Sequence, residues 1–246
     1  MKRLDPDLIT AYVEEHIGTF HRKRLDKLGT LNLKMILKRK NPYLFRAKNI
    51  YTAQELIETL LDAFLSSHEE TIFGDFLEGL AIYINQQVYG GRKSTAEGID
   101  LEFDKEGTRY IVSIKSGPYW GNSSQIARMK DNFSKAKRIL GTNRTSSHVI
   151  AVNGCCYGRD DSPDKAEYLK LCGQRFWEFI SGDPDLYTTI IEPLGHRAKE
   201  EDISFRREKG QLINRLTMNF SQEFCGDNGE IDWEKLVQFN SGIVSR

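Results

Sequence analysis

The stretch that decides the fold runs from Gly98 to Gln125 and reads GIDLEFDKEGTRYIVSIKSGPYWGNSSQ. Two segments within it, Ile99 to Phe103 and Arg109 to Lys115, are alternating or β-branched in the way that is typical of strands. The residues between them, Asp104 to Gly107, are of the types that form tight turns. The stretch therefore predicts a β-hairpin.

A helix is predicted on the N-terminal side of this hairpin. Apolar residues recur at three- and four-residue spacing from Ile72 to Ile84, which gives a helix with one apolar stripe. Ser66 or Ser67 is expected to cap this helix, and a shorter helix is expected before it, from Ala53 to Leu65. The stripe indicates that the helix packs on something large.

The C-terminal side of the hairpin continues the pattern. A helix is expected from about Asn122 to Leu140, and the following SSHVIAVNGC contains an apolar run that is typical of a buried strand. The order of helix, hairpin, helix and strand predicts an α/β fold, with a mixed central β-sheet flanked by helices.

The two ends of the chain are predicted to be mostly helical. The first forty residues contain a helix with Pro6 near its start, and the Asn41-Pro42 pair is expected to end this segment, with NPYLFRAKNI as a connector. After the sheet, helices are expected at Lys165 to Ser181, Leu186 to Ile191 and Ile203 to Phe224.

The domain organisation is predicted from the lack of any feature in the sequence that marks a domain boundary. The sequence has no internal repeat, low-complexity tract or long linker, so we expect a single domain over residues 1–246. Within it, residues 1–65 are expected to form a basic helical N-terminal part, residues 66–155 the core, and residues 156–246 a mostly helical C-terminal part.

The composition is ordinary for a soluble globular protein, with 39% hydrophobic and 28% charged residues. No window approaches the roughly 18 apolar residues that a membrane span requires. The N-terminal MKRLDPDLIT lacks the apolar run of a secretory signal, and the 4 cysteines lack the paired spacing of a zinc site. We therefore expect a cytoplasmic protein with reduced thiols and no membrane association.

The charge is unevenly distributed, although the formal net charge is zero. Between His21 and Ile50 ten basic residues face one acid, and between Tyr51 and Asp100 nine acids face two basic residues. A net charge of zero argues against an indiscriminate nucleic-acid binder. The basic segment is either a solvated helix face or a phosphate-contacting surface.

The hairpin also predicts a cluster of polar side chains. Alternation places Asp100 with Glu102 on one face of the first strand, and Ser113 with Lys115 on one face of the second. Pairing in the right register brings Asp100 beside Ser113 and Lys115. Because isolated buried charges are costly, the acid and the lysine form either a structural ion pair or part of a metal and phosphate site.

The second strand runs straight into SGPYWGNSSQ, a segment suited to nucleic-acid contacts. Its glycines permit close backbone approach, its tryptophan offers a stacking surface, and its polar side chains lie at a predicted helix N-terminus, where phosphate oxygens bind well. The candidate DNA-contacting residues are Trp120, Asn122, Ser123 and Gln125, together with Lys93 in the preceding GGRKS loop.

These features together resemble a known family. An acid on one strand, followed after a turn by a strand ending in carboxylate-x-lysine, is the PD-(D/E)XK nuclease motif, which reads here as Ile99-Asp100 and Ser113-Ile114-Lys115. The blocks IVSIKSGPYWGNSSQI, GIDLEF, NGCCYG and CGQRFWEFISGD look like type II restriction endonucleases of the PmeII-like group. The resemblance covers the chain from about Asn41 to Phe205.

The resemblance implies a restriction-endonuclease-like core and a sequence-specific, Mg²⁺-dependent enzyme that cuts double-stranded DNA. It also implies a homodimer that acts on a palindromic or interrupted palindromic site. Asp100 would bind the metal, and Lys115 would position the attacking water and offset negative charge on the phosphate.

One position departs from the family pattern. Ser113 stands where the motif usually has Asp or Glu, and serine gives a hard cation no negative ligand. Some members of the superfamily carry serine here and take the acid from a helix. On a helical wheel of the helix before the hairpin, Glu69 and Glu70 fall toward the apolar side and Glu78 lies well off it. Glu70 is the preferred second metal ligand, with Glu69, Glu78 and Glu102 as alternatives.

Two other functions stay open from the residues alone. A repair or junction-resolving nuclease would use the same core without cutting a fixed sequence. A non-catalytic DNA-binding relative would have lost its metal site, which Ser113 would then mark. The recognition sequence does not follow from the chain, because base readout depends on which side chains reach the groove edges in a folded dimer.

Overall fold

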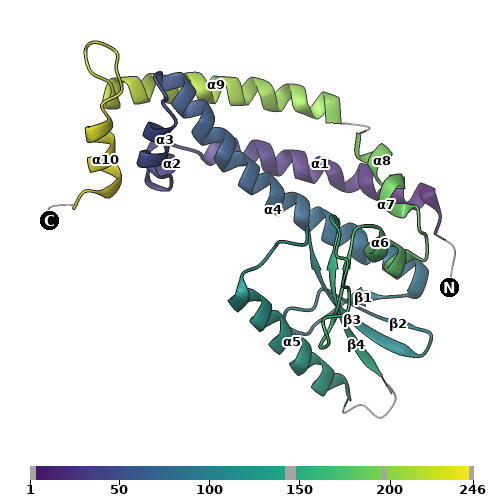
Figure 1. Ribbon diagram of the computed structural model, residues 1–246. Coiled ribbons are helices and arrows are strands. Elements are labelled where there is room, and N and C mark those ends of the chain that lie inside the picture. Colours follow the sequence, from purple (N-terminus) through teal and green to yellow (C-terminus); the bar gives the residue numbers. More distant parts are fainter. Residues whose placement is uncertain (1–3, 142–147, 196–197, 244–246) are drawn as a thin grey trace. The chain divides into compact units, whose positions relative to one another are not determined.

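The computed structural model describes residues 4–141, 148–195 and 198–243. The chain forms two compact units (Figure 1). The first, called the sheet unit here, consists of residues 1–17 and 73–197, and the second, the helical unit, of residues 18–72 and 198–246. The long helices α1 (Pro6–Thr30) and α4 (Ala53–Tyr89) each contribute residues to both units.

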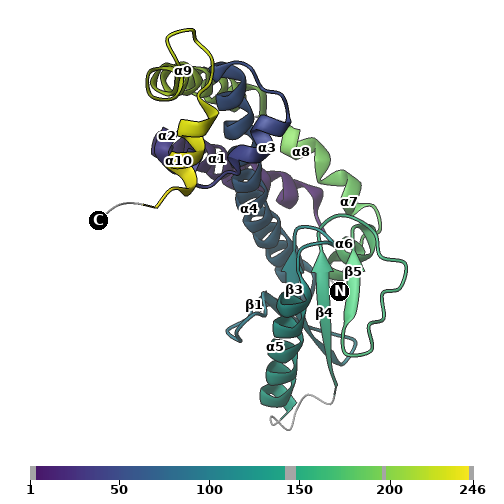
Figure 2. The same cartoon turned by 60° about the vertical axis from the view of Figure 1, so that its left-hand side comes forward.

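The sheet unit contains a five-stranded mixed sheet in the order β1-β2-β3-β4-β5. Its strands β3, β4 and β5 lie side by side in Figure 2. The first three strands are antiparallel neighbours, whereas β3, β4 and β5 run parallel. The strands are β1 (Arg92–Lys93), β2 (Leu101–Lys105), β3 (Thr108–Lys115), β4 (Val149–Cys155) and β5 (Leu169–Cys172). The predicted α/β fold with a mixed central sheet is confirmed.

The hairpin of β2 and β3 turns through Glu106 and Gly107, whose φ angles are 51° and 76°. Two consecutive residues with positive φ match the right-handed twist of the flanking strands, which favours this short loop. Leu101 lies opposite Val112 and Lys105 opposite Thr108. The predicted hairpin is therefore confirmed, with strand ends shifted by one or two residues.

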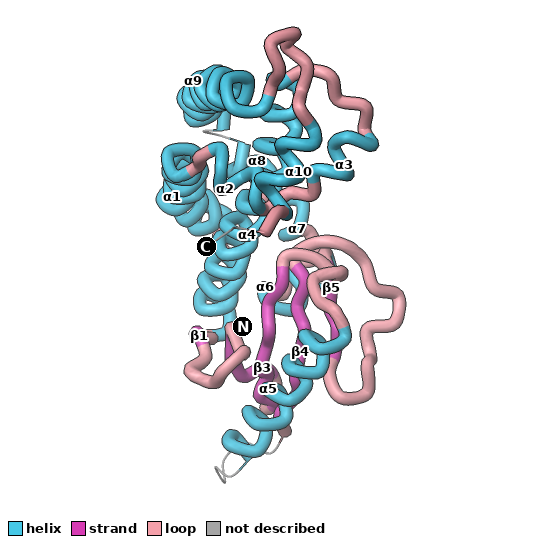
Figure 3. The backbone as a smooth tube through the Cα atoms, turned by 90° about the vertical axis from the view of Figure 1, so that its left-hand side faces the viewer, coloured by secondary structure: helices cyan, strands magenta, loops and turns pink. Residues whose placement is uncertain are grey.

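Helices cover both faces of the sheet. On one face α5 (Ser123–Gly141) packs Met129 and Phe133 against Ile111 of β3 and Ala151 of β4, and Figure 3 shows α5 lying along these strands. On the other face the ring of Phe103 contacts Tyr89 of α4 and a phenylalanine of α6 (Gln174–Ser181). Alternation along the strands sorts the apolar side chains between these two layers.

The predicted break in the helix before the hairpin is wrong, because α4 is continuous from Ala53 to Tyr89. The Ser67 hydroxyl donates to the carbonyl of Ala63 at 3.2 Å, one turn earlier, and caps nothing. Leu60 and Leu61 are buried in the helical unit, whereas Leu80 is buried in the sheet unit. Packing over the whole length of α4 outweighs the weak local preference of the serines for a helix end.

The predicted helix at Lys165 to Ser181 is also wrong in its first half. Leu169–Cys172 forms the edge strand β5, parallel to β4, and only Gln174–Ser181 is helical. Gly173 has a positive φ of 55° and separates the two elements. The strand is four residues long and gains its hydrogen bonds from β4, so local sequence gives little indication of it.

The sheet unit closes with two short helices, α7 (Leu186–Thr189) and α8 (Ile191–Gly195). The helix predicted from Leu186 to Ile191 corresponds to α7, whereas α8 begins at the last residue of the predicted range and extends beyond it.

The helical unit is built on a core shared by α4 and α9 (Ala198–Phe224), which includes Leu56, Leu60, Leu212 and Phe220. Its smaller helices are α2 (Leu33–Lys38), α3 (Pro42–Ala47) and α10 (Trp233–Ser241). The predicted connector at NPYLFRAKNI is thus partly helical, because the Asn41 side chain caps α3 and accepts from the Tyr43 amide at 3.0 Å. Among the helices that the structure describes, none is long and apolar enough to cross a membrane.

Candidate active site

Asp100 stands immediately before β2 and is held by β3. Its amide donates to the carbonyl of Val112 at 2.8 Å, which continues the hairpin ladder by one residue. Its carboxylate Oδ2 accepts from the amide of Ile114 at 2.6 Å and from the hydroxyl of Ser113 at 3.5 Å. Pairing in this register brings Asp100 beside Ser113, as alternation along the strands predicts.

Lys115, at the end of β3, completes the predicted pair. Its Nζ lies 3.9 Å from Oδ2 of Asp100, and the side chains are 31% and 21% exposed, respectively. The ammonium also lies 5.4 Å from the ring centroid of Trp120. A cation held between a carboxylate and an aromatic ring, and still open to solvent, is placed to meet a phosphate.

A second carboxylate comes from Glu78 of α4. The pKa of Glu78 is raised, first by burial and second by the negative charge of Asp100, against the opposing effects of Lys93 and Lys115. The Nζ of Lys93 lies 3.3 Å from Oε1 of Glu78. Two acids and two lysines therefore gather at the end of the hairpin.

The pKa of Asp100 is raised as well. Burial raises the pKa of its carboxyl, although the Ile114 amide and Lys115 both favour the ionised form. Glu78 and Asp100 are thus two partly buried acids whose pKa values are both raised, and the charge of Asp100 is one cause of the raised pKa of Glu78. A bound cation would remove this repulsion.

The donor set of these two acids fits a small hard cation. Mg²⁺ is commonly bound by one or two carboxylates and keeps several waters, so Glu78 and Asp100 suffice in number and chemistry. Over the described ranges 4–141, 148–195 and 198–243, no group of three or more His, Cys, Asp or Glu side chains is arranged to hold a metal ion.

The other acids considered from the sequence have different surroundings. Glu70 is exposed on α4, eight residues before Glu78, and is not among the groups that act most strongly on the pKa of Asp100 or Glu78. Glu69 pairs with Arg24 at 2.7 Å in the helical unit. Glu102 pairs with an arginine of β1 at 2.6 Å. The structure thus brings Glu78, and not the preferred Glu70, into the electrostatic surroundings of Asp100.

A buried amide that the sequence reasoning missed links the strands to the following loop. Asn153 of β4 is 1% exposed. Its Oδ1 accepts from the indole of Trp120 at 3.2 Å, and its Nδ2 donates to the carbonyl of Ser113 at 3.2 Å. Through these two bonds Asn153 fixes the ring that lies beside Lys115. The signal in the sequence was a single polar residue inside the apolar run of SSHVIAVNGC.

Three of the five predicted DNA-contacting residues, Asn122, Ser123 and Gln125, lie at the start of α5, whereas Lys93 lies in β1 and Trp120 precedes α5. Asn122 and Gln125 cap this helix reciprocally: Oδ1 of Asn122 accepts from the Gln125 amide at 3.0 Å, and Oε1 of Gln125 accepts from the Asn122 amide at 2.9 Å. Ser123 is exposed in the first turn. These capping bonds account for Asn122 and Gln125 structurally, while the exposed surface of the turn stays available to a ligand.

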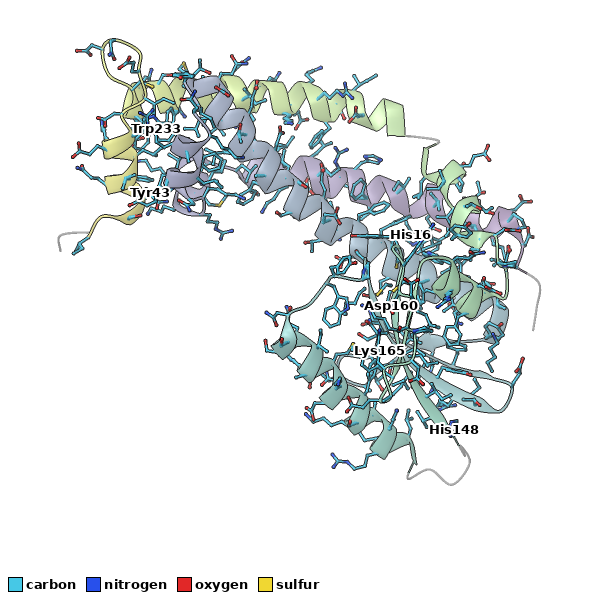
Figure 4. All side chains as sticks on the ribbon, viewed as in Figure 1. His16, Tyr43, His148, Asp160, Lys165 and Trp233 are labelled. Atoms are coloured by element: carbon cyan, nitrogen blue, oxygen red, sulfur yellow. The ribbon has the colours of Figure 1, made fainter. Side chains whose placement is uncertain are left out.

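The basic segment of residues 21–50 is only partly neutralised. Arg24 and Lys34 pair with Glu69 and Glu223. Further along, no acidic partner is found within the described part of the chain for the side chains of Lys38, Arg39, Lys40, Arg46 and Lys48. Exposed Tyr43 lies among them, and Arg46 lies 5.7 Å from the ring of Trp233, both rings being labelled in Figure 4.

Comparison with known proteins identifies the family of the chain. No curated protein matches the chain. The family model of the type II restriction endonuclease EcoO109I matches residues 7–202, which include the whole hairpin, Glu78 and Asn153. Because this match covers most of the sequence, the chain belongs to the EcoO109I family of type II restriction endonucleases.

Proposed function

We propose that the protein is a Mg²⁺-dependent restriction endonuclease that cuts double-stranded DNA at a specific palindromic or interrupted palindromic site. The observation that carries this proposal is the pair of partly buried acids, Glu78 and Asp100, whose pKa values are both raised, with the ammonium of Lys115 3.9 Å from Asp100. Such a pair costs stability in the absence of a cation, and strained charge clusters of this kind are typical of functional sites.

Asp100 and Glu78 would hold the metal, so Glu78 takes the part first expected of Glu70. When bound, Mg²⁺ polarises the scissile phosphate and lowers the pKa of the attacking water. The backbone amide of Ile114 and the hydroxyl of Ser113 orient the Asp100 carboxylate. Ser113 therefore serves the site through a hydrogen bond and not as a charged ligand.

Lys115 would act on the phosphate and on the water. Its Nζ lies 3.9 Å from Oδ2 of Asp100, and its side chain is 31% exposed. The ammonium is therefore accessible to a phosphate oxygen while it stays near Asp100. A fixed cation there stabilises the negative charge that grows on the phosphate as the water attacks, and it orients that water by hydrogen bonding.

The DNA would lie along the surface that surrounds this centre. We assign contacts there to Lys93, Trp120, Asn122, Ser123 and Gln125. Separately, within the helical unit, we assign phosphate contacts to the cations for which the structure describes no acidic partner, namely Lys38, Arg39, Lys40, Arg46 and Lys48. The capping bonds of Asn122 and Gln125 hold the first turn of α5 rigid, which lets its exposed groups meet the DNA without further ordering.

The remaining expectations are part of the same proposal. A homodimer would present one centre to each strand of a two-fold symmetric site. Both units would belong to one endonuclease domain. An enzyme that cuts DNA inside the cell would work in the cytoplasm. Membership in the PmeII-like group stays a prediction based on the quoted sequence blocks.

Digestion of a sequenced phage DNA with Mg²⁺ tests the proposal. Discrete fragments whose ends share one sequence are the expected result, and EDTA should abolish them. A smear or nicks confined to branched DNA would point to a repair or junction-resolving nuclease instead. DNA binding without cleavage in Mg²⁺ or Mn²⁺ would point to a non-catalytic relative.

A further inference from the structure

A pocket of about 470 Å³ lies in the sheet unit at the carboxyl ends of β4 and β5. Its walls are the loop after β4, the start of α6 and one residue of α7. The side chains that matter to the argument are Tyr157, Arg159, Asp161, Arg175 and Tyr187. None of the roles assigned above to the metal, the water or the DNA uses this pocket.

The pocket adjoins the proposed active site through backbone contacts. The amide of Cys156 donates to the carbonyl of Lys115 at 2.9 Å, and the amide of Tyr157 donates to the carbonyl of Ser116 at 3.0 Å. A Cβ placed on Gly117 would lie 2.4 Å from the ring of Tyr157. The wall of the pocket thus begins beside the residue that ends β3.

The loop that forms the pocket is held firmly by Asp160. This carboxylate pairs with Lys165 at 3.0 Å and with Lys170 at 3.4 Å, and Asp160 and Lys165 are labelled in Figure 4. Lys170 also donates to the carbonyl of Pro118 at 3.0 Å, and Arg175 donates to the carbonyl of Asp160 at 3.2 Å. Two lysines offset the negative charge of Asp160, which leaves Asp161 as the acid that opposes the two arginines of the pocket.

Arg159 has no ion-pair or hydrogen-bond partner among the residues that the structure describes, and it is exposed. The residues that line the pocket also include Tyr157, 54% exposed, and Tyr187, 42% exposed. A guanidinium binds phosphate oxygens in a bidentate manner, and exposed aromatic rings stack on bases. An unpaired arginine that shares a pocket with two exposed tyrosines therefore has the chemistry of a nucleotide site.

We propose that this pocket binds a nucleotide of the DNA strand next to the cleaved phosphate, with Arg159 on a backbone phosphate and Tyr157 stacked on a base. The inference rests on the proposed endonuclease function and extends it to the neighbouring nucleotide. The continuity of the pocket wall with Lys115 and Ser116 favours the DNA strand over a separate small ligand as the occupant.

The test is DNA binding by the full-length protein, with Ca²⁺ in place of Mg²⁺ so that a fluorescent duplex carrying the site stays intact. Arg159→Ala should weaken binding about tenfold, because a charge-assisted hydrogen bond is lost, and should lower the slope of log affinity against log salt by about one. Tyr157→Leu, which keeps an apolar side chain against Gly117, should weaken binding at least about fivefold through lost stacking.

The matched control is Arg138→Ala, which removes the same charge from an exposed position on α5. Equal affinities of the Arg159→Ala and Arg138→Ala variants, with matching melting temperatures, would overturn the inference while leaving cleavage by the wild-type protein intact. If Arg159→Ala lost binding of a mononucleotide or inorganic phosphate but bound DNA as well as the wild-type protein does, the inference would also be overturned. The pocket would then belong to a small ligand. Arg159-dependent DNA binding by a wild-type protein that cuts no DNA would support the pocket and refute the endonuclease.

Discussion

Replacing Glu78 with glutamine is expected to make the metal-free protein more stable. The pKa of Glu78 is raised by burial and by Asp100, so the charged side chain is unfavourable in the folded state when no cation is bound. Glutamine has nearly the same shape and carries no charge. The substitution therefore removes the desolvation cost and the repulsion while keeping an oxygen that accepts from Lys93.

The size of the effect follows from the surroundings of the carboxylate. Its side chain is 27% exposed, whereas Lys93, its cationic partner at 3.3 Å, is 71% exposed. The ion pair with such an exposed lysine contributes at most about 1 kcal/mol, and like charges a few ångströms apart near a protein surface repel by a few kcal/mol at most. We expect a net gain of about 1 kcal/mol, which corresponds to a rise of about 2–4 °C in melting temperature.

The stability gained by Glu78→Gln should depend on pH in a definite direction. A carboxyl whose pKa is higher in the folded state than in the unfolded state binds more protons when folded, so folding stability falls as the pH rises through that interval. The interval begins near the ordinary value of 4.5 and ends at the raised value. The advantage of Glu78→Gln should therefore be full at neutral pH and should shrink as the pH falls toward 4.5.

Thermal denaturation in EDTA at pH 7.5 and pH 5 measures both effects. Glu70→Gln, at the exposed position on the same helix, is the control and should leave the melting temperature unchanged. Adding Mg²⁺ at 100 times its dissociation constant should stabilise the wild-type protein by about 2.7 kcal/mol and Glu78→Gln far less. A lower melting temperature for Glu78→Gln in EDTA, or a metal response lost in Glu70→Gln instead, would refute the reasoning.

Three further perturbations test other parts of the structure. Asn153→Ala leaves the indole of Trp120 and the carbonyl of Ser113 without their partner, so it should cost about 1–3 kcal/mol in a urea titration and slow cleavage; an unchanged unfolding midpoint would contradict this. Gly154→Ala places a Cβ 2.2 Å from the ring of Phe176, so overpacking should lower the free energy of unfolding by about 1–3 kcal/mol in the same titration. An unchanged free energy of unfolding would contradict this and would mean that the ring of Phe176 moves aside. Replacing Lys38, Arg39, Lys40, Arg46 and Lys48 in and beside α2 and α3 with glutamine should reduce the salt dependence of DNA binding in Ca²⁺, with a slope change of about 0.9 for each lost phosphate contact. An unchanged slope would mean that these helices do not touch the DNA.

The hairpin could be predicted from the sequence because its determinants are local. Alternation along Leu101–Lys105 and Thr108–Lys115 sorts the side chains between two faces, and the Glu106-Gly107 turn sets the register. Once the register is set, the meeting of Asp100 with Ser113 and Lys115 follows. The local pattern of the hairpin is therefore enough to predict this part of the candidate site.

The second acid could not be predicted in the same way. The helical wheel ranks the acids by their angle to the apolar stripe, and it favours Glu70 over Glu78. The position of an acid along α4 decides which one meets the hairpin, and that position depends on how α4 packs beside β2 and β3.

The strand β5 and the amide of Asn153 were hidden for a related reason. The four residues of β5 become a strand because β4 offers them hydrogen bonds, and the segment Lys165 to Ser181 contains a true helix in its second half. Asn153 was correctly expected within a buried strand, but its partners, Trp120 and Ser113, come from parts of the chain more than thirty residues away. Long-range pairing of this kind leaves no mark on the local pattern.

The rate of DNA cleavage by Lys115→Ala tests the central claim most directly. The claim is that Asp100, Glu78 and Lys115 form one metal-dependent centre that hydrolyses DNA. Single-turnover cleavage of a phage DNA fragment in Mg²⁺ should be at least about 100-fold slower for Lys115→Ala than for the wild-type protein, because a preorganised charge at the phosphate is lost. Binding of the same fragment in Ca²⁺ should be retained. Cleavage by Lys115→Ala at the wild-type rate would contradict the account.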